Sequence, residues 1–209
     1  MVQYKLLACL LVPSLMMINW RASHSRRVST KIPESVDQNV IIRALHDQPS
    51  FIKLNPVVID VNQVPTDPAT YEVELFQTSK TWDPIETYML SSMITIIPWI
   101  GPWGQKHIQF GTWLRNTESG IKTYADAPFG VSVRSQWMVQ PDTTRGAEGR
   151  NSGSIFGIFN AHRDSGWMLV VERTVECVWW LMPFVAYTYD GVHASVGRDL
   201  VELAGVKGA

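Results

Sequence analysis

The side chains that could do chemistry in this 209-residue chain are few and scattered. His107, Arg173 and Tyr124 each lie in an apolar, β-rich stretch. A histidine titrates nearest neutral pH and is therefore the natural acid or base for a cyclisation or an isomerisation. An arginine could grip an acidic or enolate oxygen through its planar set of N–H donors, and a tyrosine hydroxyl could orient a ligand. These three residues are our candidate catalytic residues.

Motifs of high specificity are absent from the sequence. It contains no phosphate-binding glycine loop, no G-x-S-x-G elbow, and no paired-cysteine or H-E-x-x-H spacing for a metal. We therefore expect no cofactor and no metal. Function must then depend on polar side chains that enter an apolar cavity.

Aromatic residues are abundant enough to wall such a cavity. The chain has nine Trp, seven Phe and six Tyr, and each ring can bury about 150–250 Å². Trp and Tyr combine an apolar body with one polar group, which suits a pocket, although each alone is more often part of a core. Our candidate ligand-binding residues are Trp137, Ser135, Tyr71, Tyr88, Trp113 and Tyr189.

Because side chains alternate between the two faces of a strand, the sequence predicts the face on which several candidates lie. In residues 131–139 the odd positions are mainly apolar, so Trp137 and Ser135 are expected to face inward and Arg134 to face solvent. In residues 106–115 the even positions are more apolar than the odd ones. His107 is therefore expected on the more exposed face, which weighs against its catalytic role.

The direction of the Arg173 side chain is less clear from the pattern of its strand. It shares a strand face with Val171 and Val175, whereas Glu172 and Glu176 lie on the opposite face. A buried charge requires a partner. Two alternatives stay open: Arg173 turns inward and holds an acidic group, or a bulge or an ion pair at the rim keeps it in water.

The elements that must position these residues follow from periodicity. The sequence predicts a strand at 27–32, a helix at 36–46 and a long C-terminal helix from about 181. Between them it predicts strands at 57–64, 70–77, 86–97, 106–115, 121–125, 131–139 and 167–178, with a long loop at 141–166. The most economical arrangement is an α+β, helix-grip fold, in which a curved antiparallel sheet wraps around the C-terminal helix and leaves an apolar cavity.

The C-terminal helix has the clearest pattern in the chain. Its apolar residues recur at steps of three or four and form one stripe. The stripe consists of Leu181, Val185, Tyr189, Val192, Val196, Leu200 and Leu203. Gly191 and Gly197 lower helix propensity by about 1 kcal/mol each relative to Ala, so we expect close packing at both.

The N-terminal region differs from the remainder. Residues 1–25 are an apolar extension that could be a signal peptide, a short anchor or dispensable, and residues 26–205 are expected to form one ligand-binding domain. Residues 1–20 could contact a membrane. The net charge of −1 without a basic run argues against nucleic-acid binding. Two cysteines and no N-glycosylation sequon favour a cytoplasmic setting.

Two segments resemble a known superfamily. The first consists of His46-Asp47 with the following FIKLNP at 51–56, and the second consists of KTYADAPFGV at 122–131 followed by RSQW at 134–137. Both segments are similar to the START-like (SRPBCC, helix-grip) superfamily and to an uncharacterised fungal family within it. The resemblance spans about residues 26–205. It implies a hydrophobic small molecule held between the sheet and the C-terminal helix.

Three functional hypotheses follow. The chain binds a polyketide- or terpenoid-like intermediate and assists its cyclisation or isomerisation in fungal secondary-metabolite biosynthesis, with proximity and orientation doing most of the work. Alternatively, it is a non-catalytic binding or transfer protein for a lipid or another hydrophobic ligand. The third hypothesis is a structural domain whose cavity is filled by its own side chains.

Overall fold

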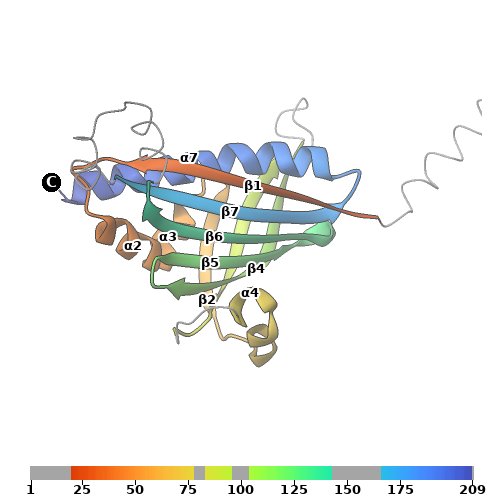
Figure 1. The fold of residues 1–209 in the computed structure, drawn as a ribbon. Coiled ribbons are helices and arrows are strands. Elements are labelled where there is room, and N and C mark those ends of the chain that lie inside the picture. The colour runs from red at the N-terminus through yellow and green to blue at the C-terminus, as the bar shows by residue number, and fades with distance from the viewer. Residues whose placement is uncertain (1–19, 78–82, 96–103, 143–165, 209) are drawn as a thin grey trace, which may run out of the picture.

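A computed structural model describes residues 20–77, 83–95, 104–142 and 166–208. In these residues a seven-stranded antiparallel sheet curves along a long C-terminal helix (Figure 1). The strands are β1 (Arg21–Ile32), β2 (Val58–Val64), β3 (Glu86–Thr95), β4 (Gln105–Thr117), β5 (Gly120–Ala127), β6 (Val131–Pro141) and β7 (Trp167–Val178). The helical elements are α2 (Gln38–His46), α3 (Gln48–Lys53), η1 (Pro68–Glu72), α4 (Glu74–Gln77), η3 (Pro128–Gly130) and α7 (Met182–Gly208). The α+β helix-grip prediction is confirmed.

The sheet joins the two ends of the domain. The strand order is β1-β7-β6-β5-β4-β3-β2, so the first strand pairs with the last one. This pairing runs without a break from Arg21 opposite Val178 to Ile32 opposite Trp167. β1 therefore begins within the segment 1–25 that the sequence suggested was an extension, because the edge of β7 offers it backbone partners along its whole length.

Helix α7 lies against the concave face of the sheet over two apolar clusters. Its C-terminal half packs with α2, α3 and the middle strands through residues that include Leu200 and Ala204. Its N-terminal half lies on a smaller cluster of Val133, Val175 and Cys177. The two clusters support the helix at both ends, and the space between them is where a cavity forms.

Helix α2 is held against one end of the sheet by a histidine. The Nε2–H group of His46 donates to the carbonyl oxygens of Thr117 and Gly120, each at 3.0 Å. These carbonyls belong to the turn between β4 and β5. His46 therefore joins α2 to the hairpin.

The prediction of a strand at 70–77 is wrong. The segment forms η1 and α4 on the outer face of the sheet, where the Phe76 side chain is fully buried. The Asp67 side chain accepts a hydrogen bond from the backbone of Ala69 at 2.9 Å and begins this turn. Lys122 and Arg115 donate to the carbonyls of Leu75 and Phe76 at 3.0 and 2.8 Å. These tertiary contacts override an apolar alternation that is typical of a strand.

The stripe of α7 differs in part from its prediction. Tyr189, Val196 and Leu200 face the sheet as expected, but Leu203 is exposed, because the buried face continues through Ala204 instead. A Cβ atom at Gly197 would lie 3.3 Å from Thr30 Oγ1, as the expected close packing requires. Gly191 has open space around it, so the same expectation is wrong there.

Several predicted segments lie outside the described residues. These are residues 1–19, which contain most of the predicted extension, and most of the predicted loop at 141–166. Within the described residues, no helix combines the length and the apolar character needed to cross a membrane.

Two glycine-to-alanine substitutions test this packing. A Cβ at Gly120 would lie 2.0 Å from the carbonyl oxygen of Trp137, so Gly120→Ala must displace backbone between β5 and β6. We expect it to lower the free energy of unfolding by more than about 2 kcal/mol. Gly191→Ala is the matched control and should raise this free energy by about 1 kcal/mol, since a helix favours Ala over Gly. Urea unfolding measures both, and similar values for the two variants would contradict the packing.

Candidate functional site

A small cavity lies between the concave face of the sheet and α7. Its volume is about 90 Å³. Ser135 and Trp137 of β6 line it from the sheet, and Tyr189 and His193 of α7 line it from the helix. The other lining residues are mainly apolar and include Phe51, Leu90, Phe110, Leu114, Val133 and Val196.

A row of stacked groups crosses this cavity wall. The rings of Trp137 and His193 stack with centroids 5.7 Å apart, and those of His193 and Tyr189 stack at 4.4 Å. The guanidinium carbon of Arg173 lies 5.9 Å from the Tyr189 ring centroid. At the other end, Phe51 meets Trp137 edge to face at 5.1 Å. Each group restricts the rotamer of its neighbour, so the row forms a rigid wall.

His193 is a neutral imidazole within this row. Its Nδ1–H group donates to the carbonyl oxygen of Tyr189 at 3.2 Å, which leaves Nε2 with a lone pair. Burial lowers the pKa of His193 from 6.5 to about 4, and the positive charge of Arg173 acts in the same direction. Burial also raises the pKa of Tyr189 to about 12. Both rings are therefore uncharged at neutral pH.

Ser135 is the polar group that the fold leaves unsatisfied in the cavity. Its side chain is buried, and its hydroxyl has no hydrogen-bond partner among the described residues. A buried hydroxyl without a partner costs about 1–3 kcal/mol. Its location on a mainly apolar wall suits a ligand that carries a polar group.

The Arg173 side chain turns inward, and its charge is paired with a carboxylate of this chain and not with a ligand. It donates to the carbonyl oxygen of Tyr189 at 2.8 Å and forms an ion pair with the carboxylate of Asp190. Only 1% of its side chain is exposed, compared with 22% for Asp190. Burial, together with the nearby charge of Arg26, lowers the pKa of Arg173, yet a guanidinium stays protonated in proteins. Arg173 therefore holds a carboxylate of α7 at the helix face.

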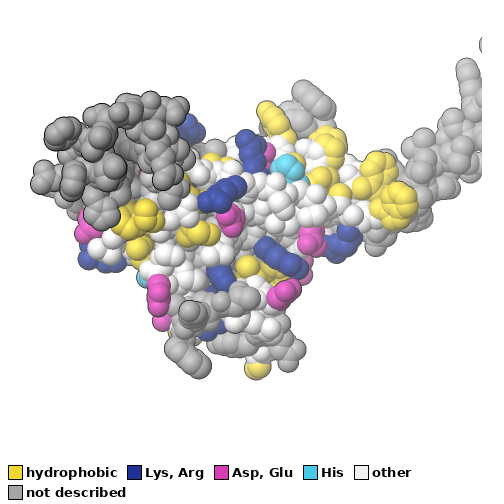
Figure 2. Space-filling view, viewed as in Figure 1, with side chains coloured by type: hydrophobic (Ala, Val, Ile, Leu, Met, Phe, Trp, Pro, Cys, Tyr) yellow, Lys and Arg dark blue, Asp and Glu magenta, His cyan; other side chains and the backbone are white. Residues whose placement is uncertain are grey.

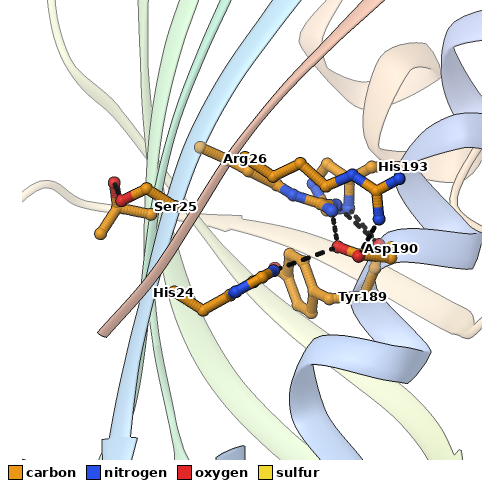
Figure 3. A network of polar contacts seen from close by, with 8 residues as sticks. His24, Ser25, Arg26, Tyr189, Asp190 and His193 are labelled. Atoms are coloured by element: carbon orange, nitrogen blue, oxygen red, sulfur yellow. Dashed lines mark hydrogen bonds and ion pairs between the residues drawn. The ribbon is translucent and has the colours of Figure 1, made fainter. Parts of the chain in front are cut away.

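The Asp190 carboxylate lies close to basic side chains from two strands. Arg26 of β1 forms an ion pair with one carboxylate oxygen, and Arg173 of β7 pairs with the other. Nε2 of His24, also on β1, lies 3.8 Å from Asp190. Figure 3 shows His24 and Arg26 converging on Asp190 from the strand side. This cluster joins α7 to both β1 and β7.

The remaining candidate residues lie elsewhere. His107, Tyr124 and Trp113 are on the outer face, because their strand neighbours Ile108, Thr123 and Leu114 point inward. The Trp113 and Tyr124 rings contact each other there at 5.3 Å.

Two further candidates are tyrosines outside the cavity wall. Tyr88 is buried in the core, where its hydroxyl donates to Glu86 at 2.5 Å and burial raises its pKa. Tyr71 belongs to η1, but its side chain is outside the described residues. The structure thus brings Trp137, Ser135 and Tyr189 together at the cavity.

The sequence analysis missed His193 and Asp190. His193 lies four residues after Tyr189 and three before Val196, so the helical spacing that selected those residues could have selected it as well. Nothing in the sequence pairs Asp190 with a particular arginine. In the part of the chain that the structure describes, no group of three or more His, Cys, Asp or Glu is arranged to hold a metal ion.

Removal of the Asp190 charge tests the cluster. In Asp190→Asn, Arg173 stays buried without an anion, and we expect the free energy of unfolding to fall by about 3 kcal/mol. Glu172→Gln is the matched control, since it breaks the exposed Arg27–Glu172 pair at 3.2 Å and should change stability by less than about 1 kcal/mol. Urea unfolding at neutral pH measures both. Equal losses would show that the buried pair does not anchor α7.

The depressed pKa of His193 predicts a pH dependence. Between pH 6.5 and about 4, the unfolded chain binds a proton at this residue and the folded chain does not, so stability falls as the pH is lowered through this range. We expect the wild type to lose up to about 3 kcal/mol more over this range than His193→Phe, which keeps a ring in the stack. Urea unfolding at several pH values tests this, and parallel curves for the two proteins would contradict it.

Comparison with solved structures gives similar chains of low identity, among them the following. TTHA0849 from Thermus thermophilus is 10% identical with a TM-score of 0.49, over 89% of this chain and 99% of that chain. Ara h 8.0201 is 10% identical with a TM-score of 0.46, over 87% and 99%. The hypothetical protein jhp0584 from Helicobacter pylori is 11% identical with a TM-score of 0.42, over 88% of each chain.

Comparison of sequences assigns a family. No curated protein matches this chain. Residues 21–205 match the model of a family described as "Domain of unknown function (DUF7053)". This match begins at the first residue of β1 and ends within α7, so it includes the whole sheet and the cavity. The chain therefore belongs to the DUF7053 family.

Proposed function

We propose that the protein binds a compact hydrophobic small molecule, carrying one polar group, between the sheet and α7. The observation that carries this proposal is the buried, unpartnered hydroxyl of Ser135 on an apolar cavity wall, as seen among the described residues. A ligand that hydrogen-bonds to this hydroxyl would remove its desolvation cost. Its apolar part would contact the stacked rings of Trp137 and His193.

The dimensions of the cavity restrict the ligand. A volume of about 90 Å³ is below the range of about 300–1,000 Å³ that is usual for drug-sized ligands. The described walls therefore suit a molecule near the size of a single ring, and a larger ligand requires α7 to move. The polar groups on the wall that could bind it include the Ser135 hydroxyl and the imidazole of His193.

Binding without catalysis fits the side chains better than catalysis does. His107 and Tyr124 lie on the outer face of the sheet, and Arg173 is occupied by Asp190. These positions leave the cavity with few groups that could transfer a proton. A carrier or binding role for a hydrophobic molecule is therefore our first candidate.

Catalysis is our second candidate, and His193 is the observation that favours it. A neutral imidazole on a cavity wall could act as a general base in the cyclisation or isomerisation of a polyketide- or terpenoid-like molecule. Its pKa of about 4 makes it a weak base. The connection to fungal secondary metabolism comes only from the sequence resemblance. In a catalyst, His193→Phe would abolish turnover while a bound ligand is retained.

A substitution of Ser135 tests the binding site. p-Cresol and toluene differ by one hydroxyl, so calorimetric titration of both measures what a polar group adds to affinity. We expect the wild type to bind p-cresol more tightly than toluene. In Ser135→Ala, affinity for p-cresol should fall about tenfold, affinity for toluene should be unchanged, and stability should rise by about 1 kcal/mol.

Ser92 supplies the matched control. Its hydroxyl is also buried and has no partner among the described residues, but Ser92 does not line the cavity. Ser92→Ala should therefore raise stability similarly and leave both affinities unchanged. The proposal fails if neither probe binds and native mass spectrometry of the purified chain finds no co-purified small molecule. It also fails if Ser92→Ala weakens p-cresol binding as much as Ser135→Ala does.

A further inference from the structure

Large aromatic side chains are exposed together at one end of the molecule. We call this surface the aromatic tip. It consists of Trp20, Phe129, Trp179, Trp180, Phe184 and Tyr187. Figure 2 shows hydrophobic side chains at this end, where β1 begins and β7 turns into α7. A cluster of exposed rings is informative because single exposed apolar residues are normal and grouped ones mark interaction sites.

Hydrogen bonds to backbone carbonyl groups bring the members of the tip together. The Trp179 N–H group donates to the carbonyl oxygen of Trp20 at 2.8 Å, so the start of β1 lies beside the end of β7. The Arg21 guanidinium donates to the carbonyl oxygen of Gly130 at 3.2 Å, which places the β5–β6 turn and Phe129 at the same end. The tip is therefore assembled from three separate parts of the chain.

The start of α7 carries apolar residues on two faces. Leu181, Val185 and Tyr189 pack on the smaller core cluster. Phe184 and Tyr187 are three residues apart and share another face, which is exposed. Trp180, in the turn just before the helix, is exposed as well. Packing on the sheet explains the first face but not the second, since 85% of Tyr187 is exposed.

Phe129 is held outward at a conformational cost. Its φ of 65° lies in the left-handed region, which is unfavourable for a bulky side chain. Phe129 is 54% exposed, and Nζ of Lys106 lies 5.4 Å from the centroid of its ring. A strained backbone that presents an apolar ring to solvent indicates a functional constraint on this turn.

The composition of the tip and of the sequence that adjoins it favours one kind of partner. Residues 1–19, with Lys5 as their only charge, join the described structure at Trp20. The uncharged sequence IIPWIGPW at 96–103 connects β3 to β4, next to the pairing of Thr95 with Gln105. Tryptophan and tyrosine are the residues that concentrate at membrane interfaces, and cations such as Arg21 and Lys106 favour anionic lipid headgroups.

We propose that the aromatic tip docks on the interface of a lipid membrane. The rings of Trp180, Phe184 and Tyr187 enter the boundary between headgroups and acyl chains, while Arg21 and Lys106 lie at headgroup level. The tip combines exposed Trp and Tyr rings with the cations Arg21 and Lys106, which suits the headgroup region of a lipid membrane. This proposal is independent of the cavity and its ligand.

Vesicle flotation of the full chain tests the proposal. The probes are large vesicles of phosphatidylcholine alone and of phosphatidylcholine with about 30% phosphatidylserine. We expect the wild type to float with both kinds of vesicle and to bind the anionic ones more tightly. Phe184→Gln with Tyr187→Gln should lower the partition coefficient about tenfold or more, because two exposed rings are lost from the interface.

Leu203→Gln is the matched control on the same helix. Leu203 is 47% exposed and lies about 24 Å along the helix axis from Tyr187, so its substitution should leave vesicle binding unchanged. Thermal unfolding should show that both variants are folded.

Three results would overturn the proposal. The first is a wild type that does not float with either vesicle. The second is a double variant that binds as the wild type does, which would assign binding to another part of the chain. The third is a wild type that forms dimers by size-exclusion chromatography while the double variant is monomeric, which would assign the tip to contacts between copies.

Discussion

The ion pair between Arg173 and Asp190 is the constraint on which the arrangement of sheet and helix depends. A strand residue with its charge buried on the concave face requires an anion there, and α7 supplies it. Arg26 reaches the same carboxylate from β1, so the helix is tied to two adjacent strands. Apolar packing alone is non-directional and would tolerate shifts of α7 along the sheet, whereas this cluster selects one position.

The position of α7 along the sheet also determines which side chains line the cavity. With Asp190 held by the two arginines, Tyr189 lies under Arg173 and His193 stacks between Tyr189 and Trp137. The row of rings spaces the helix from the sheet between the two apolar clusters. Ser135, opposite the helix, then has its hydroxyl in an apolar space without a partner among the described residues. One charged contact therefore positions the helix wall of the pocket, and the shape of this pocket is what the proposed small ligand would have to match.

Local patterns predicted much of the sheet because strand alternation directly reports which face is buried. The inward direction of Trp137 and Ser135 and the outward direction of Arg134 follow from the apolar odd positions of β6. The same reasoning placed His107 on the exposed face. It failed at residues 70–77, where alternation suggested a strand. There the buried Phe76 and the hydrogen bonds from Lys122 and Arg115 stabilise short helices, and these partners lie far away in the sequence.

The sequence by itself determined the class of fold, the amphipathic C-terminal helix and the face on which most candidate residues lie, since each depends on periodicity within one element. Only the tertiary structure decided that Arg173 binds Asp190, that His193 completes the stack, and that exposed aromatics from three parts of the chain meet at one end. Each of these depends on distances between elements, which local spacing does not encode. The candidate residues on each face could therefore be predicted, among them Trp137, Ser135 and Tyr189 of the cavity. The individual contacts between strand and helix residues could not.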